Sequence, residues 1–364
     1  MKIESKWPLI KLEDIIELIS GQSPSSEFYN DKGEGLPFYQ GKADFGDEVL
    51  AAPRIWTSQI TKEAIKNDIL MSVRAPVGPV NLNLLSKICI GRGLNALRAN
   101  SKKLNYKYLF QFLKFNQDLI IGNDGAIFQS ISRDQILNIK IPLPPMNVQE
   151  KIVTEIERIE KEEQQTIDKL DSLKQSIFDR LKALKSKGKV SSLCKIRNQK
   201  INPQDHLDKE FINIGLEDIE THTGRFLQQP SMRGEDILSI KHVFKKGDVL
   251  YGKLRPYLNK VATAETDGIC STDILVLQTD MPQILKYILL SNELVEQTSK
   301  LVSGLRMPRI KPHDLMKLSA PMPDDKEQKQ IAADIGKTEA QIAGLQEKLS
   351  KIPAAKDAVL KKHL

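Results

Sequence analysis

Cysteine, histidine and long apolar runs are scarce in this chain of 364 residues. The three cysteines, Cys89, Cys194 and Cys270, are widely spaced and odd in number, which argues against a disulfide framework and a cysteine-based zinc site. Such usage is typical of a reducing compartment, and we expect the chain to be cytoplasmic. The five histidines, which show no metal-ligand spacing, are His206, His222, His242, His313 and His363.

No segment predicts a membrane helix or a secretory signal. No run approaches the roughly 18 apolar residues that a membrane span needs. Residues 1–16 lack an uninterrupted apolar region and a small-residue cleavage site. With 40% hydrophobic and 28% charged residues, the composition predicts a globular chain, and its length favours two domains.

Motifs of nucleotide and methyl-transfer enzymes are also absent. The segment "NPQD" (202–205) lacks the second proline and the aromatic residue of a methyltransferase tetrad, and "GRG" (91–93) is a fragment of a glycine loop. No P-loop is present. The segment "PDDKEQK" (323–329) contains the acids and lysine of a nuclease cluster, but it falls at an expected helix start. We therefore expect no catalytic site, metal or cofactor in this chain.

The sequence does contain two similar copies of one unit. A shift of 179 residues superposes Pro142 on Pro321 and Gln149 on Gln328, and "KNDIL" (66–70) matches "KGDVL" (246–250) at a shift of 180. Further matches in the same order are Gly125 with Gly304, Ile131 with Ile310, Pro144 with Pro323, Ile152 with Ile331, Ile156 with Ile335 and Leu170 with Leu349. An ordered series at a nearly constant shift indicates an internal repeat.

Each copy mixes helical and strand patterns, which predicts an α+β class. The apolar runs at 68–73, 87–91 and 273–278 are bounded by turn residues and predict strands. Residues 105–115 and 281–301 carry one apolar stripe and predict helices, and "DIIELI" (14–19) has helical spacing.

A proline-rich connector and a long helix end each copy. Apolar residues in alternating steps of four and three predict a coiled-coil seam. In the first helix they are Ile152, Ile156, Ile159, Leu170, Leu173, Ile177, Leu181 and Leu184, and in the second Ile331, Ile335, Ile342, Leu345, Leu349 and Ile352. Glu163 and Thr166 interrupt the first seam. We expect the two helices to pack antiparallel within the chain, which brings the C-terminus near Met1. Asn147 and Asp324 or Asp325 are the predicted N-caps.

The predicted architecture is two tandem α/β domains related by a pseudo-two-fold axis, each followed by a long helix. The domains span residues 1–145 and 188–323, and the helices span 146–187 and 324–364. The two helical segments are almost neutral, because the net charge is −1 over residues 149–186 and +1 over residues 324–364. The formal net charge of +7 therefore lies in the domains, which indicates a polyanionic partner.

At this point the chain resembles a known family, the type I restriction–modification specificity subunit. The resemblance rests on "WPLIKLEDIIELISGQSP" (7–24) and "GAIFQSISRDQILNIKIPLPPMNVQEKI" (125–152), and in the second copy on "GDVLYGKLRPYLNK" (247–260) and "SGLRMPRIKPHDLMKLSAPMPDDKEQKQI" (303–331). The family implies two target-recognition domains that each read half of a split double-stranded DNA target. It also implies helices that set the spacer and dock two methyltransferase subunits, with restriction subunits joining them. S-adenosylmethionine would bind in those partners.

Reading base edges and phosphates requires cationic and amide or hydroxyl side chains in loops. The candidates in the first copy are Arg74, Lys87, Arg92, Gln129, Ser130 and Arg133. Those in the second copy are Lys253, Arg255, Lys260, Arg306, Arg309 and Lys311. Weaker candidates are Arg54, Arg225 and Arg233. The alternative is a non-catalytic two-headed adaptor whose coiled coil binds proteins rather than DNA.

Overall fold

The computed structural model describes residues 5–121, 130–302 and 306–364. The chain divides into two compact units, with residues 1–164 and 350–364 in unit 1 and residues 165–349 in unit 2. It therefore crosses between the units twice, after Gln164 and after Leu349. Among the described helices, none is both long enough and apolar enough to span a bilayer.

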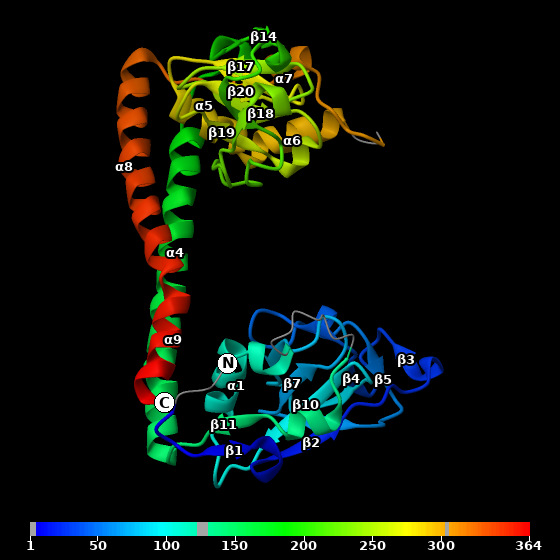
Figure 1. Ribbon diagram of the computed structural model, residues 1–364. Coiled ribbons are helices and arrows are strands. Elements are labelled where there is room, and N and C mark those ends of the chain that lie inside the picture. Colours follow the sequence, from blue (N-terminus) through cyan, green and yellow to red (C-terminus); the bar gives the residue numbers. More distant parts are fainter. Residues whose placement is uncertain (1–4, 122–129, 303–305) are drawn as a thin grey trace. The chain divides into compact units, whose positions relative to one another are not determined.

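Unit 1 places short sheets beside helix α1 and the first part of the long helix α4 (Figure 1). Its strands are β1 (Leu9–Lys11), β2 (Ile16–Ser20), β3 (Tyr29–Asn30), β4 (Leu36–Tyr39), β5 (Trp56–Thr57), β6 (Glu63–Ile65), β7 (Ile69–Ser72), β8 (Val80–Leu82), β9 (Lys87–Ile90), β10 (Leu94–Ala99) and β11 (Lys140–Pro142). Its α-helices are α1 (Tyr106–Phe115), α2 (Asp118–Ile121), α3 (Arg133–Leu137), the first part of α4 (Met146–Lys182) and α9 (Ile352–His363). Three 3-10 turns are η1 (Leu12–Asp14), η2 (Ser26–Phe28) and η3 (Lys42–Asp44).

Unit 2 repeats this arrangement with the rest of α4. Its strands are β12 (Lys187–Lys189), β13 (Lys195–Ile196), β14 (Lys200–Ile201), β15 (Glu210–Ile214), β16 (Ser231–Arg233), β17 (Lys241–Phe244), β18 (Val249–Gly252), β19 (Val261–Thr263), β20 (Gly268–Cys270), β21 (Ile274–Gln278) and β22 (Ser319–Pro321). Its further α-helices are α5 (Pro282–Leu290), α6 (Asn292–Leu301), α7 (Pro312–Lys317) and α8 (Asp325–Ser350). Its 3-10 turns are η4 (Val190–Ser192), η5 (Pro203–Asp205), η6 (Gly234–Asp236) and η7 (Pro256–Leu258).

The sheet topology confirms the internal repeat. The four-stranded sheet has the order β2-β10-β7-β8 in unit 1 and β13-β21-β18-β19 in unit 2. A two-stranded sheet closes each unit, β1-β11 and β12-β22. Each five-stranded sheet contains one parallel pair, β4 with β9 and β15 with β20. The α+β class predicted from the sequence is therefore confirmed.

The strands predicted at 68–73, 87–91 and 273–278 appear as β7, β9 and β21. The helical prediction for residues 14–19 was wrong. After a single 3-10 turn the chain forms β2, in which Ile16 and Leu18 are buried while Glu17 between them is exposed. This two-residue alternation lets β2 pair with β10, and the apolar run was too short for its period to be assigned from sequence.

Two predicted helices are each divided. Residues 281–301 form α5 and α6 around Ser291, whose extended backbone ends α5 and whose hydroxyl caps α6. The second long helix, predicted over 324–364, breaks at Lys351 into α8 and α9. Pro353 lies in the first turn of α9, where its missing N–H costs no hydrogen bond, whereas inside a continuous helix it would remove one.

The spacing from proline to glutamine, which is the same in the two copies, has a structural role. The buried side chain of Gln149 donates to the carbonyl of Pro144 at 2.8 Å and accepts from the N–H of Asn105 at 2.8 Å. Gln328 likewise donates to the carbonyl of Pro323 at 3.3 Å. In each unit a glutamine in the first turn of the long helix therefore binds the connector that precedes it.

One of the predicted N-caps is confirmed. The Asp324 carboxylate accepts from the N–H groups of Lys326 and Glu327 at 2.9 and 2.8 Å, and the Glu327 side chain accepts from the N–H of Asp324. This reciprocal pattern is a capping box at the start of α8. Asn147 is not a cap, because α4 already begins at Met146 and Asn147 lies inside its first turn.

In unit 1, α9 packs antiparallel on the first part of α4 (Figure 1). Lys356 contacts Glu163 at 2.9 Å, whereas His363, seven residues later, contacts Glu155 at 3.0 Å. The chain end is held near the start of the described chain, because the N–H of Lys6 donates to the carbonyl of Leu364 at 2.8 Å. The seam interruption at Glu163 is thus matched by a lysine on the facing helix.

In unit 2, α8 covers the second part of α4 in the same antiparallel sense. Ile177 and Leu181 of α4 share one core with Ile331, Ile335 and Ile342 of α8. These five predicted seam residues are therefore buried together, as the 4/3 spacing requires.

Replacing Lys356 with alanine should destabilise unit 1 by about 1–3 kcal/mol. The Lys356 side chain is 7% exposed and contacts both Glu160 and Glu163, which are 26% and 33% exposed. Its removal takes the shared cation away from two half-buried carboxylates, and their partial exposure to water limits the cost. Urea unfolding measures the change. Lys361→Ala, which removes an exposed lysine paired within α9, is the control and should change stability by less than about 0.5 kcal/mol.

Candidate nucleic-acid interface

Three chain segments meet in unit 1 at the positions where the sequence places candidate residues. The N–H of Val73 donates to the carbonyl of Gly93 at 3.0 Å, and the N–H of Ile131 donates to the carbonyl of Val73 at 3.1 Å. Arg74 and Ser130 form an isolated β-bridge. We call residues 73–79, 91–93 and 130–133 loop cluster 1.

The same three segments meet in unit 2 through equivalent bonds. The N–H of Lys253 donates to the carbonyl of Asp273 at 2.9 Å, and the N–H of Ile310 donates to the carbonyl of Lys253 at 3.0 Å. Leu254 and Arg309 form the matching β-bridge. We call residues 253–260, 271–273 and 306–311 loop cluster 2. Candidates far apart in sequence are thus brought together in both units by one backbone framework.

Several candidate side chains in these clusters are exposed and form no ion pair with a residue that the structure describes. Arg74, Arg92 and Ser130 of loop cluster 1 are exposed, and neither guanidinium has an ion-pair partner within the described part of the chain. In loop cluster 2 the exposed candidates without an ion pair to a described residue are Arg255, Arg306 and Lys311, and Lys253 is half-buried. Such side chains are available to an external anion.

Arg74 and Arg255 do not occupy equivalent positions. The repeat aligns Pro76 with Pro256, so Arg255 falls on Ala75 and Arg74 on Leu254. The backbones also differ, because the Ala75–Pro76 peptide is cis whereas Arg255 has a left-handed conformation with φ +49°. The side chains of the two arginines therefore start from different backbone positions in their loop clusters.

Other candidates are engaged inside their own unit. Arg133 donates to the carbonyl of Leu18 at 2.7 Å. Lys87 pairs with Glu63 at 3.0 Å. The ammonium of half-buried Lys260 donates to the carbonyls of Leu216 and Ile219 at 2.7 and 2.8 Å.

The Lys260 geometry gives that side chain a structural role, because it satisfies two backbone acceptors. Its ammonium is therefore not available to DNA. Gln129 lies outside the described residues.

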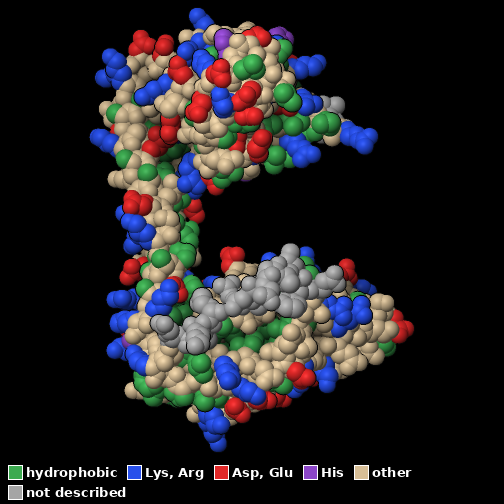
Figure 2. Space-filling model, viewed as in Figure 1, with side chains coloured by type: hydrophobic (Ala, Val, Ile, Leu, Met, Phe, Trp, Pro, Cys, Tyr) green, Lys and Arg blue, Asp and Glu red, His purple; other side chains and the backbone are tan. Residues whose placement is uncertain are grey.

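The weaker candidates are all paired with acids. Arg54 contacts Asp44 at 3.1 Å, and Arg225 contacts Glu220 at 2.6 Å. Arg233 contacts both Asp208 and Glu235 at 3.0 Å. Figure 2 likewise shows Lys and Arg interspersed with Asp and Glu over the visible surface of each unit. The candidate interface is therefore defined by the two loop clusters rather than by a surface of one charge sign.

Arg309 is the exception among the exposed cations of loop cluster 2. Its Nε and Nη2 donate to the two carboxylate oxygens of Asp273 at 3.1 and 3.2 Å. Sequence analysis missed Asp273. The repeat carried a signal for it, because Asp273 aligns with Gly93 and Arg309 with Ser130, so both partners are absent from the first copy together.

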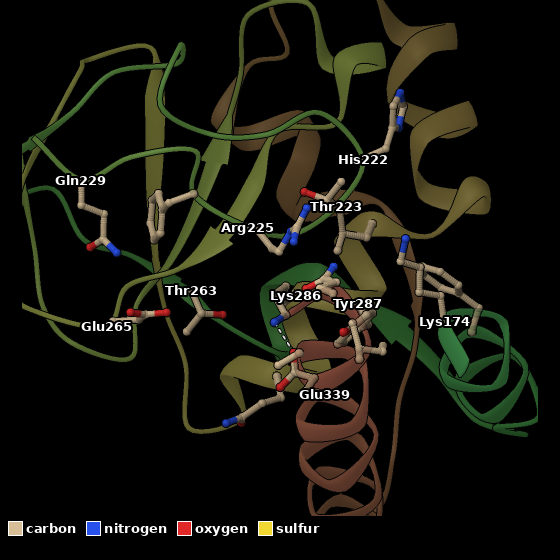
Figure 3. A pocket seen from close by; sticks show the side chains of 18 residues that line it. Lys174, His222, Thr223, Arg225, Gln229, Thr263, Glu265, Lys286, Tyr287 and Glu339 are labelled. Atoms are coloured by element: carbon tan, nitrogen blue, oxygen red, sulfur yellow. Dashed lines mark hydrogen bonds and ion pairs between the residues drawn. The ribbon is translucent and has the colours of Figure 1, made fainter. Parts of the chain in front are cut away.

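A cavity of about 530 Å³ in unit 2 is lined by residues outside loop cluster 2 (Figure 3). Lys286 of α5 reaches across it to form an ion pair with Glu339 of α8. Arg225, which also lines the cavity, is held by Glu220. These two cations are therefore neutralised by neighbours, and the Lys286–Glu339 pair links α5 to α8.

The described residues contain no cluster of three or more His, Cys, Asp or Glu side chains that could hold a metal ion. Burial raises the pKa of the Cys194 and Cys270 thiols to about 12, so both are protonated at neutral pH and are poor nucleophiles. Their burial favours a structural role for both thiols.

Comparison with known proteins gives a consistent picture. Residues 4–174 match the family described as "Type I restriction modification DNA specificity domain". The MjaX specificity subunit of Methanocaldococcus jannaschii, named as part of a type I restriction enzyme, is 38% identical over 178 residues. That match covers 46% of this chain and 41% of the relative, so it spans less than half of the relative's length.

Two further matches extend over nearly the whole chain. The type I restriction enzyme MjaVIII specificity subunit of the same organism is 22% identical over 374 residues, covering 91% of this chain and 86% of the relative. A solved type I restriction–modification S subunit from M. genitalium has a TM-score of 0.51 at 14% identity. It covers 100% of this chain and 98% of that chain, which shows a shared fold.

Proposed function

Because residues 4–174 match the type I restriction modification DNA specificity domain, we propose that this chain is a type I specificity subunit and that it reads a bipartite double-stranded DNA target, with one loop cluster for each half-site. The supporting observation is the pair of loop clusters. Their backbone hydrogen bonds are equivalent, whereas their side chains differ. A constant framework with different exposed donors suits two modules that do one task on different sequences.

In the proposed mechanism the exposed cations bind phosphates and nearby polar side chains read base edges in the major groove. In unit 1 the cations are Arg74 and Arg92, and Ser130 is the nearby polar side chain. In unit 2 the exposed cations are Arg255, Arg306 and Lys311, and half-buried Lys253 lies beside them. Phosphate contacts position the protein on the duplex, and base contacts select the sequence. The antiparallel pairs that α4 makes with α8 and α9 would hold the two half-sites at a fixed spacing.

The partners in this proposal are two methyltransferase subunits docked on the helices, joined by restriction subunits for cleavage. S-adenosylmethionine would bind to the methyltransferase subunits. Those subunits would flip an adenine from each half-site for methylation. The chain itself would act as a non-catalytic subunit. Mapping methylated bases in the host genome tests this, because two constant half-sites around one fixed gap are expected.

A salt titration distinguishes DNA binding from the alternative adaptor function. We expect the affinity of the chain with its methyltransferase partner for target DNA to fall steeply with salt, because each phosphate contact releases counterions. The double variant Arg74→Ala/Arg92→Ala should lower the slope of log K against log[salt] by about two, at roughly 0.9 per contact. Fluorescence anisotropy over a salt series measures both slopes.

Lys102→Ala is the matched control, because Lys102 is an exposed cation of unit 1 outside loop cluster 1. It should leave the slope unchanged. A flat slope for the unmodified complex would favour the protein-binding adaptor. An equal change in slope for the double variant and the control would remove loop cluster 1 from the interface.

A further inference from the structure

The Asp273–Arg309 pair joins two of the three segments of loop cluster 2. The carboxylate takes the Nε and Nη2 side of the guanidinium through two hydrogen bonds. The backbone on either side of Arg309 is also fixed, because the N–H of Ile310 donates to the carbonyl of Lys253 and the carbonyl of Pro308 accepts from the N–H of Arg255 at 2.7 Å. Arg309 is thus a positioned arginine rather than a freely moving surface cation.

Loop cluster 1 does not need such a pair to assemble. Gly93 and Ser130 stand at the equivalent positions, yet the backbone hydrogen bonds of the cluster are made in the same way. The pair is therefore not a requirement of the shared fold. It distinguishes unit 2 from unit 1, as a determinant of half-site sequence must.

Structural Asp–Arg pairs in this chain differ from this pair. Asp68 binds Arg98 in unit 1 and Asp248 binds Arg197 in unit 2, and these aspartates align in the repeat. Their carboxylates are only 2% and 4% exposed. Asp273 and Arg309 are 27% and 44% exposed, and exposed pairs of this kind contribute little to stability.

The carboxylate leaves one edge of the guanidinium available. An arginine has five N–H donors, and Asp273 accepts one from Nε and one from Nη2. The two N–H groups of Nη1 and the second of Nη2 remain, and among the described residues no acceptor takes them. This end-on edge has the spacing that matches O6 and N7 of guanine in the major groove.

The negative charge of Asp273 also favours base reading over phosphate binding. It offsets the arginine charge that would attract a phosphate, while the directional donors are kept. A cluster intended for phosphate alone gains nothing from a carboxylate, because that group repels the DNA backbone.

We propose that Arg309, oriented by Asp273, reads a guanine in the half-site bound by unit 2. The assignment rests on the function proposed above. Arg309 contacts the base in this scheme, and Asp273 is a positioning residue that acts through it. The free cations around them, Arg255, Arg306 and Lys311, supply the phosphate contacts.

The test is binding selection with the full chain in complex with its methyltransferase partner. The probe is a library of duplexes randomised one base pair at a time across both half-sites. Arg309→Ala should abolish the preference for guanine at one position of one half-site, a loss of about tenfold to a hundredfold in discrimination. Preferences in the other half-site should be unchanged, because in this scheme unit 1 reads that half-site.

Two further variants separate reading from folding. Arg309→Lys keeps the positive charge beside Asp273 but loses the rigid planar fork of the guanidinium, so it should weaken the same preference. Asp273→Asn keeps one acceptor but frees the arginine charge, which should weaken the preference and steepen the salt slope. Lys311→Ala is the matched control and should weaken binding to all sequences equally.

A uniform loss of affinity in Arg309→Ala, or an unchanged guanine preference in both Arg309 variants, would overturn the assignment. Thermal melts establish whether each variant folds, and Arg309→Lys carries the test if Arg309→Ala does not. If the unmodified complex shows no sequence-dependent DNA binding, the proposed function itself fails, which is a distinct result.

Discussion

A seven-residue insertion at both chain crossings should lengthen the spacer of the recognised DNA by about three base pairs and leave both half-sites unchanged. One insertion extends α4 after Gln164, and the other extends the returning chain after Leu349. Seven residues form about two helical turns and about 10.5 Å of helix, and they preserve the 4/3 seam. Since the rise per base pair is about 3.4 Å, this length corresponds to about three base pairs.

Binding selection with randomised spacers measures the new optimum. Inserting seven residues into α4 alone is the control, because the return segment would then be too short for both pairs of helices to form. That variant should lose stability and bind no defined bipartite target. An unchanged spacer in the paired insertion, with melting like that of the parent chain, would contradict the proposal that the helices set the spacing.

Replacing residues 187–321 with a second copy of residues 9–142 should convert the target into an inverted repeat of the first half-site. The cuts lie at the paired ends of the equivalent two-stranded sheets, where Leu9 faces Pro142 and Lys187 faces Pro321. In the proposed mechanism two identical heads related by the pseudo-two-fold axis read the same sequence on opposite strands. Because several base pairs change at once, affinity for the original target should fall at least about a hundredfold.

The exchange preserves contacts to the long helices. Lys107 and Lys286 are equivalent in the repeat, and each pairs with a glutamate of its long helix, Glu157 and Glu339. Methylation mapping or binding selection identifies the new target, and circular dichroism checks folding. A folded chimera that still selects the original second half-site would show that sequence reading does not reside in residues 187–321.

The repeat made much of the fold predictable. Aligned prolines and glutamines located the two connectors, and Asp324 or Asp325 was predicted as a cap because a short polar side chain at a helix start is a local pattern. Patterns shorter than about two helical turns were less informative. Residues 14–19 form a strand because β10 offers a partner, and the helix over 281–301 divides where Ser291 competes for the backbone.

The sequence by itself determined the internal repeat, the class of each copy and the seam that joins α4 to α8 and α9. These features are periodic or local, so residue spacing alone carries them. Tertiary structure alone decided which cations are available. Lys260 binds carbonyls 41 and 44 residues away, and Arg309 binds an aspartate 36 residues away. The choice of ion-pair and hydrogen-bond partners depends on which loops meet, and no local period encodes that meeting. The free arginines of loop cluster 1 and the positioned Arg309 of loop cluster 2 became distinguishable only once the segments were in contact.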